Sequence, residues 1–167
     1  NSGTLMVNGS LTSDVDNRCF LGGSVTIKGD VDNRGIISPG NSIGVLTIDG
    51  SYIHHSGATL FAEISPSGNS DKLNVNGTAT LNGGTVKTSL ARALYTDGFG
   101  WNILSADGGV IGQFSAIEGQ PTSETVDLVL ITGQQGVDLQ IQRTSYGSFG
   151  VTKGQKATGV GLDMIVP

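Results

Sequence analysis

The sequence predicts an all-β fold in which short strands stack in parallel as the turns of a β-solenoid, closed at the C-terminal side by a β-hairpin. Three observations favour this fold. A short unit with alternating apolar residues recurs in the first half of the chain, a glycine follows the strand in each copy, and 27 of the 167 residues are glycine. Repeats with a period of roughly 20 to 50 residues are typical of solenoids.

The repeating unit is a short strand followed by a polar residue and glycine. Its four copies read GTLMVNGSL, GSVTIKGDV, GVLTIDGSY and DKLNVNGTA. The positions that we take as equivalent are spaced by 20, 21 and 27 residues and are Val7, Ile27, Ile48 and Val75. Alternation of apolar and polar residues gives each strand one buried face.

An antiparallel meander is the alternative, because Asn-Gly and Asp-Gly also favour hairpins. Meander strands recur about every 8 to 12 residues, so the longer period here favours a coil with two or three strands per turn. Further strands are expected at 35–38, 59–64 and 80–88, where they would form the other sides of the coil. Polar side chains are expected to stack at the corners, namely Asn8, Asp49 and Asn76.

The repeat fades beyond residue 90, which divides the chain into rungs at 1–90, a capping segment at 91–143 and a terminal segment at 144–167. Two alternating segments, 126–132 and 137–143, flank Gly-Gln-Gln-Gly and predict a hairpin. The end of a solenoid exposes an open core, so a cap is expected there. We assign no fixed structure to the terminal segment.

Two groups of apolar residues are expected to hold this fold together. The core columns of the coil are Leu46, Ile48, Leu73 and Val75. The core of the cap consists of Trp101, Ile103, Val126, Leu128, Leu139 and Ile141. The insertion at 65–70, Ser-Pro-Ser-Gly-Asn-Ser, is expected to leave the coil as a loop at a corner.

Composition argues against several classes of function. Nine basic and 14 acidic side chains give a net charge of −5, so nucleic acid is not an expected partner. The single cysteine, Cys19, excludes an intrachain disulfide and a cysteine-based zinc site. His54 and His55 are adjacent on an expected strand and therefore point to opposite faces, which disfavours a metal site.

The motif Gly-Asn-Ser-Ile-Gly at 40–44 matches the G-x-S-x-G nucleophile elbow, which requires a strand before the serine and a helix after it. Here Pro39 precedes the motif and an expected strand follows it, so the motif is interpreted as a corner. A carbohydrate-active β-helix enzyme would need carboxylates grouped on one outer face, and Glu63 and Asp71 are too sparse for that. We therefore expect no enzyme activity, no catalytic residue, no cofactor and no metal.

The segment ISPGNSIGVLTIDGSY at 37–52 resembles the SPGNSIGTLTVNGNY-like signature of bacterial autotransporter passengers, which are exported by type V secretion. The stretches GATL at 57–60, SDKLNVNGTA at 70–79 and LNGGTV at 81–86 continue the pattern in the same order. Near the end, residues that resemble the family's lead into a linker are Tyr146, Phe149, Gln155 and Leu162–Asp163. The chain is thus similar to the C-terminal autochaperone region of the pertactin/AIDA-like family.

The resemblance implies a right-handed parallel β-helix that nucleates folding of the passenger at the cell surface, after periplasmic transit and translocation across the outer membrane. Its partners would be its own N-terminal passenger rungs and its own C-terminal outer-membrane β-barrel. Residues 144–167 would then be a linker toward a barrel outside this sequence, which reads as an internal piece of a longer protein. Gly154, Gly159 and Gly161 depart from the family's alanines and disfavour a helix in the linker.

Two alternative functions stay open at this point. The coil could be an adhesin surface whose partner is a ligand on host or neighbouring cells, although only 5% of the residues are aromatic. The third class is the carbohydrate-active enzyme, which would depend on Glu63 or Asp71.

Overall fold

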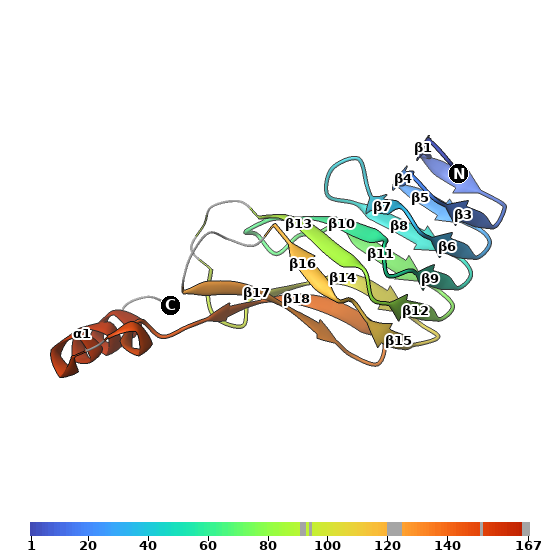
Figure 1. Ribbon diagram of the computed structural model, residues 1–167. Helices are drawn as coiled ribbons and strands as arrows, with labels where there is room; N and C mark the ends of the chain where they lie inside the picture. The colour runs from blue at the N-terminus through green and yellow to red at the C-terminus, as the bar shows by residue number, and fades with distance from the viewer. Residues whose placement is uncertain (91–92, 94, 120–124, 151, 165–167) are drawn as a thin grey trace.

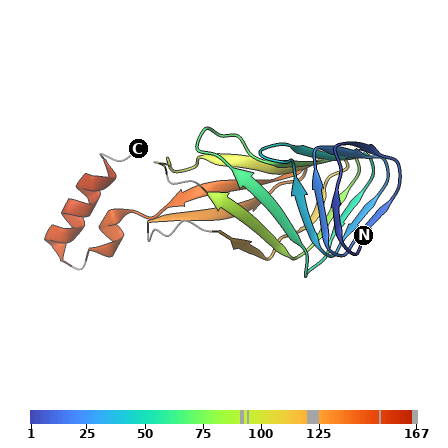
Figure 2. The ribbon, with the colours of Figure 1, turned by 90° about the horizontal axis from the view of Figure 1, so that it is seen from above.

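The computed structural model describes residues 1–90, 93, 95–119, 125–150 and 152–164. The chain winds as a parallel β-helix around three sheets, and each turn contributes one strand to each sheet (Figure 1). Seen from above, successive turns lie side by side from the N-terminal end toward a long hairpin (Figure 2). The fold class predicted from the sequence is confirmed.

Among the described residues the strands divide into three sheets, A, B and C. In spatial order, sheet A contains β1 (Thr4–Met6), β4 (Phe20–Gly23), β7 (Ile36–Pro39), β10 (Thr59–Ile64), β13 (Thr85–Leu90) and β16 (Ala116–Glu118). Sheet B contains β2 (Gly9–Leu11), β5 (Val25–Ile27), β8 (Val45–Ile48), β11 (Lys72–Val75), β14 (Gly100–Ala106), β18 (Gly136–Arg143) and β17 (Val126–Thr132). Sheet C contains β3 (Val15–Asn17), β6 (Val31–Asn33), β9 (Tyr52–His54), β12 (Ala79–Asn82) and β15 (Val110–Gln113).

The first turn is shorter than the sequence repeat suggested. Equivalent residues in contact on successive turns are 16, 21, 27 and 31 residues apart. Ile27 pairs with Leu11 rather than Val7, so the equivalence expected for Val7 is wrong. The strand that precedes Val7 lies in sheet A beside β4, because the alternating pattern shows that a strand is present but not which side of the coil it forms.

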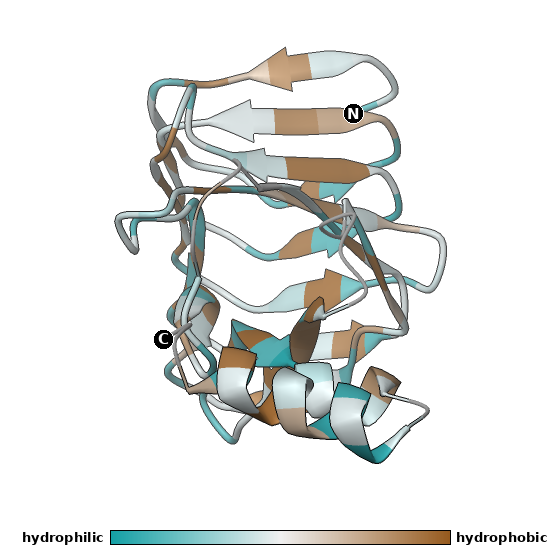
Figure 3. Ribbon diagram, turned by 90° about the vertical axis from the view of Figure 1, so that its left-hand side faces the viewer, coloured by the Kyte–Doolittle hydropathy of each residue, from teal (hydrophilic) through white to brown (hydrophobic). Residues whose placement is uncertain are grey.

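The interior is a set of aliphatic columns. Leu73 lies beside Leu46, and Val75 beside Ile48, with each side chain at most 2% exposed. Figure 3 shows apolar segments recurring at similar places in the stacked strands. These burials agree with the expected core, while the part that the four residues play in folding stays a prediction.

A column of glycines explains the glycine that ends most of the repeats. It runs along one corner through Gly29, Gly50, Gly77 and Gly108. The Gly77 amide donates to the Gly50 carbonyl at 2.8 Å, and a Cβ on Gly77 would lie 2.6 Å from that same oxygen. Each glycine is required because the backbone of the neighbouring turn occupies the space that a side chain would need. Beside this column, Asn76 donates to Asp49 at 3.0 Å as expected, whereas Asn8 instead accepts from Asn41.

The coil continues beyond residue 90, where we expected the rungs to stop. Strands β14, β15 and β16 pair in parallel with β11, β12 and β13 and complete a further turn. The segment Leu104–Gly108, LSADG, repeats the pattern of Leu73–Gly77, and its Gly108 continues the glycine column. The long connection between β13 and β14 hid this copy, because it lengthens the period to 31 residues.

The predicted hairpin is confirmed as β17 and β18, here called the hairpin cap. It adds to β14 in antiparallel orientation and closes the end of sheet B. Of the expected cap core, Val126 is half-buried, and the fully buried members are Trp101, Ile103, Leu128, Leu139 and Ile141. The cap therefore covers the last turn with the apolar face of a hairpin.

The terminal segment contains a helical unit made of the 3-10 helix η1 (Tyr146–Phe149) and the α-helix α1 (Lys153–Asp163), although we assigned it no fixed structure. Figures 1 and 2 place this unit beyond the hairpin cap, at the opposite end from the N-terminus. A capping box formed by Thr152 and Gln155 starts α1. Across the residues that the structure describes, neither helix has the length and apolar character needed to span a membrane.

The glycine column predicts a contrast between two Gly→Ala variants. Gly77→Ala should lower the free energy of unfolding by about 1–3 kcal/mol, because the new methyl group would overlap the Gly50 carbonyl. Gly57→Ala, at an exposed position with no atom within 4 Å of the new Cβ, should be neutral or stabilise by about 0.4–1 kcal/mol. Urea denaturation of both variants checks the contrast, and equal effects would contradict the close stacking.

Candidate functional site at the junction of coil and cap

Strand β14 joins the two parts of the molecule. It pairs in parallel with β11 on one side and antiparallel with β18 on the other, with a bulge between Asn102 and Leu104. The bulge turns both Ile103 and Leu104 into the core, where each is fully buried. The Asn102 amide donates to the Leu104 carbonyl at 3.2 Å and to Asp138 Oδ1 at 2.7 Å, and so satisfies polar groups at the bulge.

Three aromatic residues form a cluster beneath this junction. The ring of Trp101 lies edge-to-face with those of Phe99 and Tyr95, at centroid distances of 5.1 and 5.8 Å. The Trp101 indole N–H donates to the Ser65 carbonyl at 2.8 Å. Trp101 belongs to the cap core predicted from the sequence, whereas Tyr95 and Phe99 were not predicted, although their closeness in a chain with 5% aromatic residues was a usable signal.

The insertion loop, residues 65–70, folds against this cluster. Gly68 lies next to the Phe99 ring, and the Ser70 hydroxyl donates to the Asn102 carbonyl at 3.2 Å. Together with the Trp101 hydrogen bond, these contacts connect a loop of the coil to the strand that carries the cap. The loop leaves the coil as expected, and it also braces the junction.

Asp71 fastens the base of the insertion loop to the preceding turn. Its carboxylate accepts the Gly44 N–H at 2.8 Å and the Glu63 N–H at 2.9 Å, and the residue is 1% exposed. Burial raises the pKa of Asp71 to about 6, against the opposing effect of these two amides. With both oxygens engaged by backbone, Asp71 is not placed beside Glu63 as an open pair of acids, which gives no support to the carbohydrate-active alternative.

A second cluster of polar groups lies inside the coil, and we call it the polar column. It consists of Asn17, Asn33, Tyr52 and His54, all fully buried. Asn17 donates to Asn33 Oδ1 at 2.7 Å, and Asn33 donates to the Tyr52 hydroxyl at 3.2 Å. The Tyr52 hydroxyl also forms a hydrogen bond with His54 Nδ1 at 2.7 Å, in which the imidazole tautomer decides the donor. The column thus connects three successive turns.

The environment of His54 favours its neutral form. Burial lowers the pKa of His54 to about 4, with a smaller opposing effect from the Ala58 carbonyl. The ring of Phe114 packs edge-to-face on it at 4.9 Å. Burial also raises the pKa of Tyr52.

The two adjacent histidines point to opposite faces, as expected. His55 Nε2 lies outside the coil, 2.8 Å from Asp32 Oδ1, the same carboxylate oxygen with which Arg34 forms an ion pair. In the described ranges, His, Cys, Asp and Glu side chains do not gather in any group of three that could hold a metal ion.

Ser42 lies in the turn between β7 and β8, so the elbow-like motif has strands on both sides. Gly40 adopts a φ of 83°, and Asn41 donates to Asn8 at 2.9 Å. The Gly44 amide at the end of the motif is held by Asp71. The motif forms a corner of the coil, as expected.

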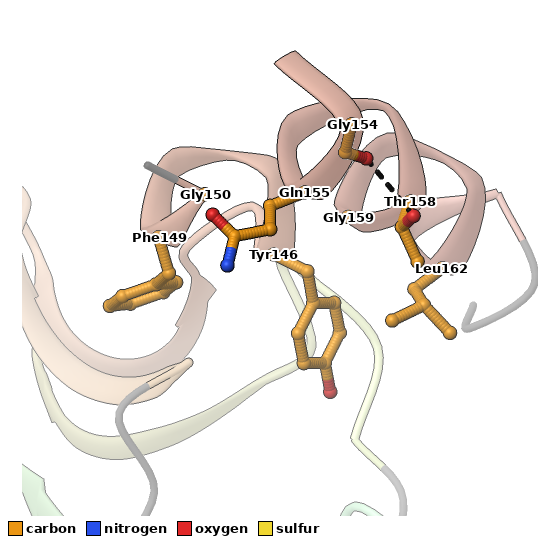
Figure 4. Close-up of a pocket in the computed structure, with 8 residues that line it drawn as sticks. All are labelled: Tyr146, Phe149, Gly150, Gly154, Gln155, Thr158, Gly159 and Leu162. Atoms are coloured by element: carbon orange, nitrogen blue, oxygen red, sulfur yellow. Dashed lines mark hydrogen bonds between the residues drawn. The ribbon is translucent and has the colours of Figure 1, made fainter. Parts of the chain in front are cut away.

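The helical unit carries a pocket of about 460 Å³ between η1 and α1, which is largely open to solvent (Figure 4). Its walls are mainly apolar or glycine, and the lining residues are Tyr146, Phe149, Gly150, Gly154, Gln155, Thr158, Gly159 and Leu162. The Asp163 carboxylate locks the unit by accepting from the Tyr146 amide at 2.8 Å and from the Ser145 hydroxyl. Hydrogen bonding to Ser145 is the main cause that lowers the pKa of Asp163.

No protein-family model matches the chain. Over 177 aligned residues the chain is 31% identical to a Serratia marcescens protein named extracellular serine protease. The alignment covers 98% of this chain and 17% of that protein, so the chain spans about one sixth of the length of the curated relative it matches.

This similarity corrects one expectation. We expected no enzyme activity from the sequence, and the name of the relative points to an enzyme instead. The expectation rested on residues within this chain, whereas the relative is a much longer protein.

The buried imidazole predicts a loss of stability in acid. The pKa of His54 is about 4 in the folded chain and near 6.5 when unfolded, so on acidification the unfolded chain binds the proton first. Stability should therefore fall by about 3 kcal/mol between about pH 6.5 and pH 4. His54→Leu should remove this loss of stability. Leucine suits the position because Leu81 occupies the equivalent place on the next turn.

Urea denaturation near neutral pH and near pH 4 measures the difference. The raised pKa of Asp71 acts in the opposite direction, but it is common to both proteins and cancels. His55→Leu, outside the coil, should keep the loss and is the matched control. An equal loss in wild type and His54→Leu would contradict the assignment.

Proposed function

We propose that the chain is the C-terminal stem of a secreted autotransporter passenger and acts as its autochaperone, nucleating folding of the β-helix at the cell surface. The observation that carries the proposal is the change from parallel to antiparallel pairing at β14. A parallel stack needs a neighbour on each side, whereas a hairpin can form from its own local contacts. The hairpin cap is therefore the part of the molecule best suited to fold first.

Templated stacking follows from the energetics of the coil. Each turn buries its aliphatic face only against a neighbouring turn, so stability is nearly a sum of turns and interfaces. Once the hairpin cap and the last turn of the coil have folded, β14, β15 and β16 form the edges onto which the next turn can add. If the C-terminal turns are exported first, each turn that folds outside the cell would oppose return of the chain through the outer membrane. This needs no nucleotide hydrolysis.

The insertion loop and the aromatic cluster extend this nucleus toward the coil. Trp101 holds the Ser65 carbonyl, and Asp71 holds the Gly44 amide of the preceding turn. These contacts connect the cap with two turns of the coil. The helical unit beyond the cap would serve as the start of the linker toward the outer-membrane barrel.

The relative supports two wider parts of the proposal. Its name describes an extracellular protein, which supports a secreted or cell-surface location for this chain. The same name supports a serine peptidase as the enzyme to which this stem belongs. The signature at 37–52 supports the autotransporter route of export.

Two identical truncations at opposite ends of the coil test the nucleation role. Leu139 in the cap and Leu21 in sheet A are both fully buried, so each change to Ala should cost about 2–5 kcal/mol. In the full-length protein, Leu139→Ala should reduce protease-resistant passenger at the cell surface roughly tenfold, because it slows nucleation. Leu21→Ala should leave display nearly unchanged, because it acts after nucleation.

Surface display is measured by labelling intact cells, followed by limited proteolysis. Trp101→Ala and Leu128→Asp should act like Leu139→Ala. Equal losses of displayed passenger for Leu21→Ala and Leu139→Ala would mean that display depends only on the overall stability of the chain, and would contradict a nucleus at the cap.

The peptidase part has its own test. A fluorophosphonate probe, which reacts with activated serines, should label the full-length protein and abolish peptidase activity in the culture medium. Absence of labelling on a correctly displayed protein would rule out the serine peptidase while leaving the nucleation role intact.

A further inference from the structure

We infer that the polar column specifies the register that the N-terminal turns adopt, and that Asn33 is its central positioning residue. Asn33 lies between Asn17 on one turn and His54 on the next in the register of sheet C. Its amide group bonds in both directions, accepting from Asn17 and donating to the Tyr52 hydroxyl. The inference rests on the proposed templated stacking, because a turn that adds to a template has to choose a register.

The aliphatic columns alone leave that choice open. A shift by one residue would expose the buried face, but a shift by two keeps apolar residues inside. In sheet B, Ile27 lies beside Ile48, and a two-residue shift would bring it beside Leu46, which is equally aliphatic. The glycine column favours the observed register at its own corner, because a Cβ at Gly50 would lie 2.3 Å from the Gly29 carbonyl oxygen, and the polar column adds a second constraint inside the coil.

The polar column distinguishes these registers. A two-residue shift displaces Asn33 by about 6.6 Å along the strand, out of hydrogen-bond reach of its present partners. The Asn33 amide would then be buried without those partners, a state that proteins avoid. A buried polar group that selects one register at some cost in stability has a precedent in coiled coils.

The column is confined to the N-terminal turns. The register positions that follow His54 in sheet C are Leu81 and Gly112, which carry no side-chain hydrogen-bonding group. The turns next to the cap are held instead by the junction contacts. The polar column therefore acts on the turns that add furthest from the proposed nucleus.

Disulfide trapping in the 167-residue chain tests the inference. In a Cys19→Ser background, Thr26→Cys with Thr47→Cys reports the observed register, since these outward residues are paired between β5 and β8. Paired Cα atoms lie about 4.8 Å apart, within the range for a disulfide. Thr26→Cys with Val45→Cys, or with Asp49→Cys, reports shifts of two residues, at about 8 Å in the observed register and so unable to bond.

With Asn33 present, only the in-register pair should cross-link under mild oxidation. Asn33→Leu should raise cross-linking of a shifted pair about tenfold and lower that of the in-register pair. It leaves Asn17 bonded to the Ile36 carbonyl and Tyr52 bonded to His54, which limits other damage. An in-register yield unchanged in Asn33→Leu, with no shifted product, would overturn the inference.

Val31→Ala is the matched control, because Val31 is buried on the same strand and its truncation weakens packing while keeping the polar column. Equal slippage in Val31→Ala would also overturn the inference. Should Asn33→Leu fail to fold, Tyr52→Phe removes only the hydroxyl and should produce a smaller shift in the same direction. The trapping needs no secretion, so a failed display test with intact register selection would reject nucleation at the cap and not the polar column.

Discussion

Parallel hydrogen bonding between successive turns is the constraint on which the rest of the structure depends. It places every residue directly beside its equivalent one strand spacing away, about 4.8 Å. The column in which a position lies therefore determines which residue types fit there. Glycine is required where the next backbone passes close by, as at Gly50 and Gly77, aliphatic residues fill the interior, and amides are accepted inside only where they bond along the column.

Much of this fold could be predicted from the sequence because columns leave a periodic trace. Strands at 59–64 and 126–132 have the predicted bounds, and the repeated glycines mark a real corner. The first turn could not be placed, because the same alternation occurs in all three sheets and Val7 resembles Ile27 only in local pattern. The last turn was missed for the opposite reason, since its local pattern at Leu104–Gly108 is clear but its spacing is long.

The candidate site was less predictable than the fold, because it depends on contacts between segments without a shared period. Trp101 was recognisable as the single tryptophan. Its hydrogen-bond partner, however, is the backbone carbonyl of Ser65, and every residue has such a carbonyl, so the partner could not be predicted from residue types. The helical unit gives a similar lesson. Gly159 lowers helix propensity, but a Cβ there would lie 2.5 Å from the Gly147 amide nitrogen, so the glycine permits close packing of α1 on η1. Propensity was outweighed by tertiary packing.

The corrected view of enzyme activity follows from the same constraint. Side chains in the columns are committed to contacts between turns, as His54 is to Tyr52 and Asp71 to Gly44. The polar residues inside such a coil therefore reflect its packing, and they say little about the chemistry of a protein in which a segment like this occupies 17% of the length. Catalytic groups can be added to a β-helix in loops, where the chain leaves the columns. The insertion at 65–70 is such a loop, and the strands on either side of it, β10 and β11, keep their pairing.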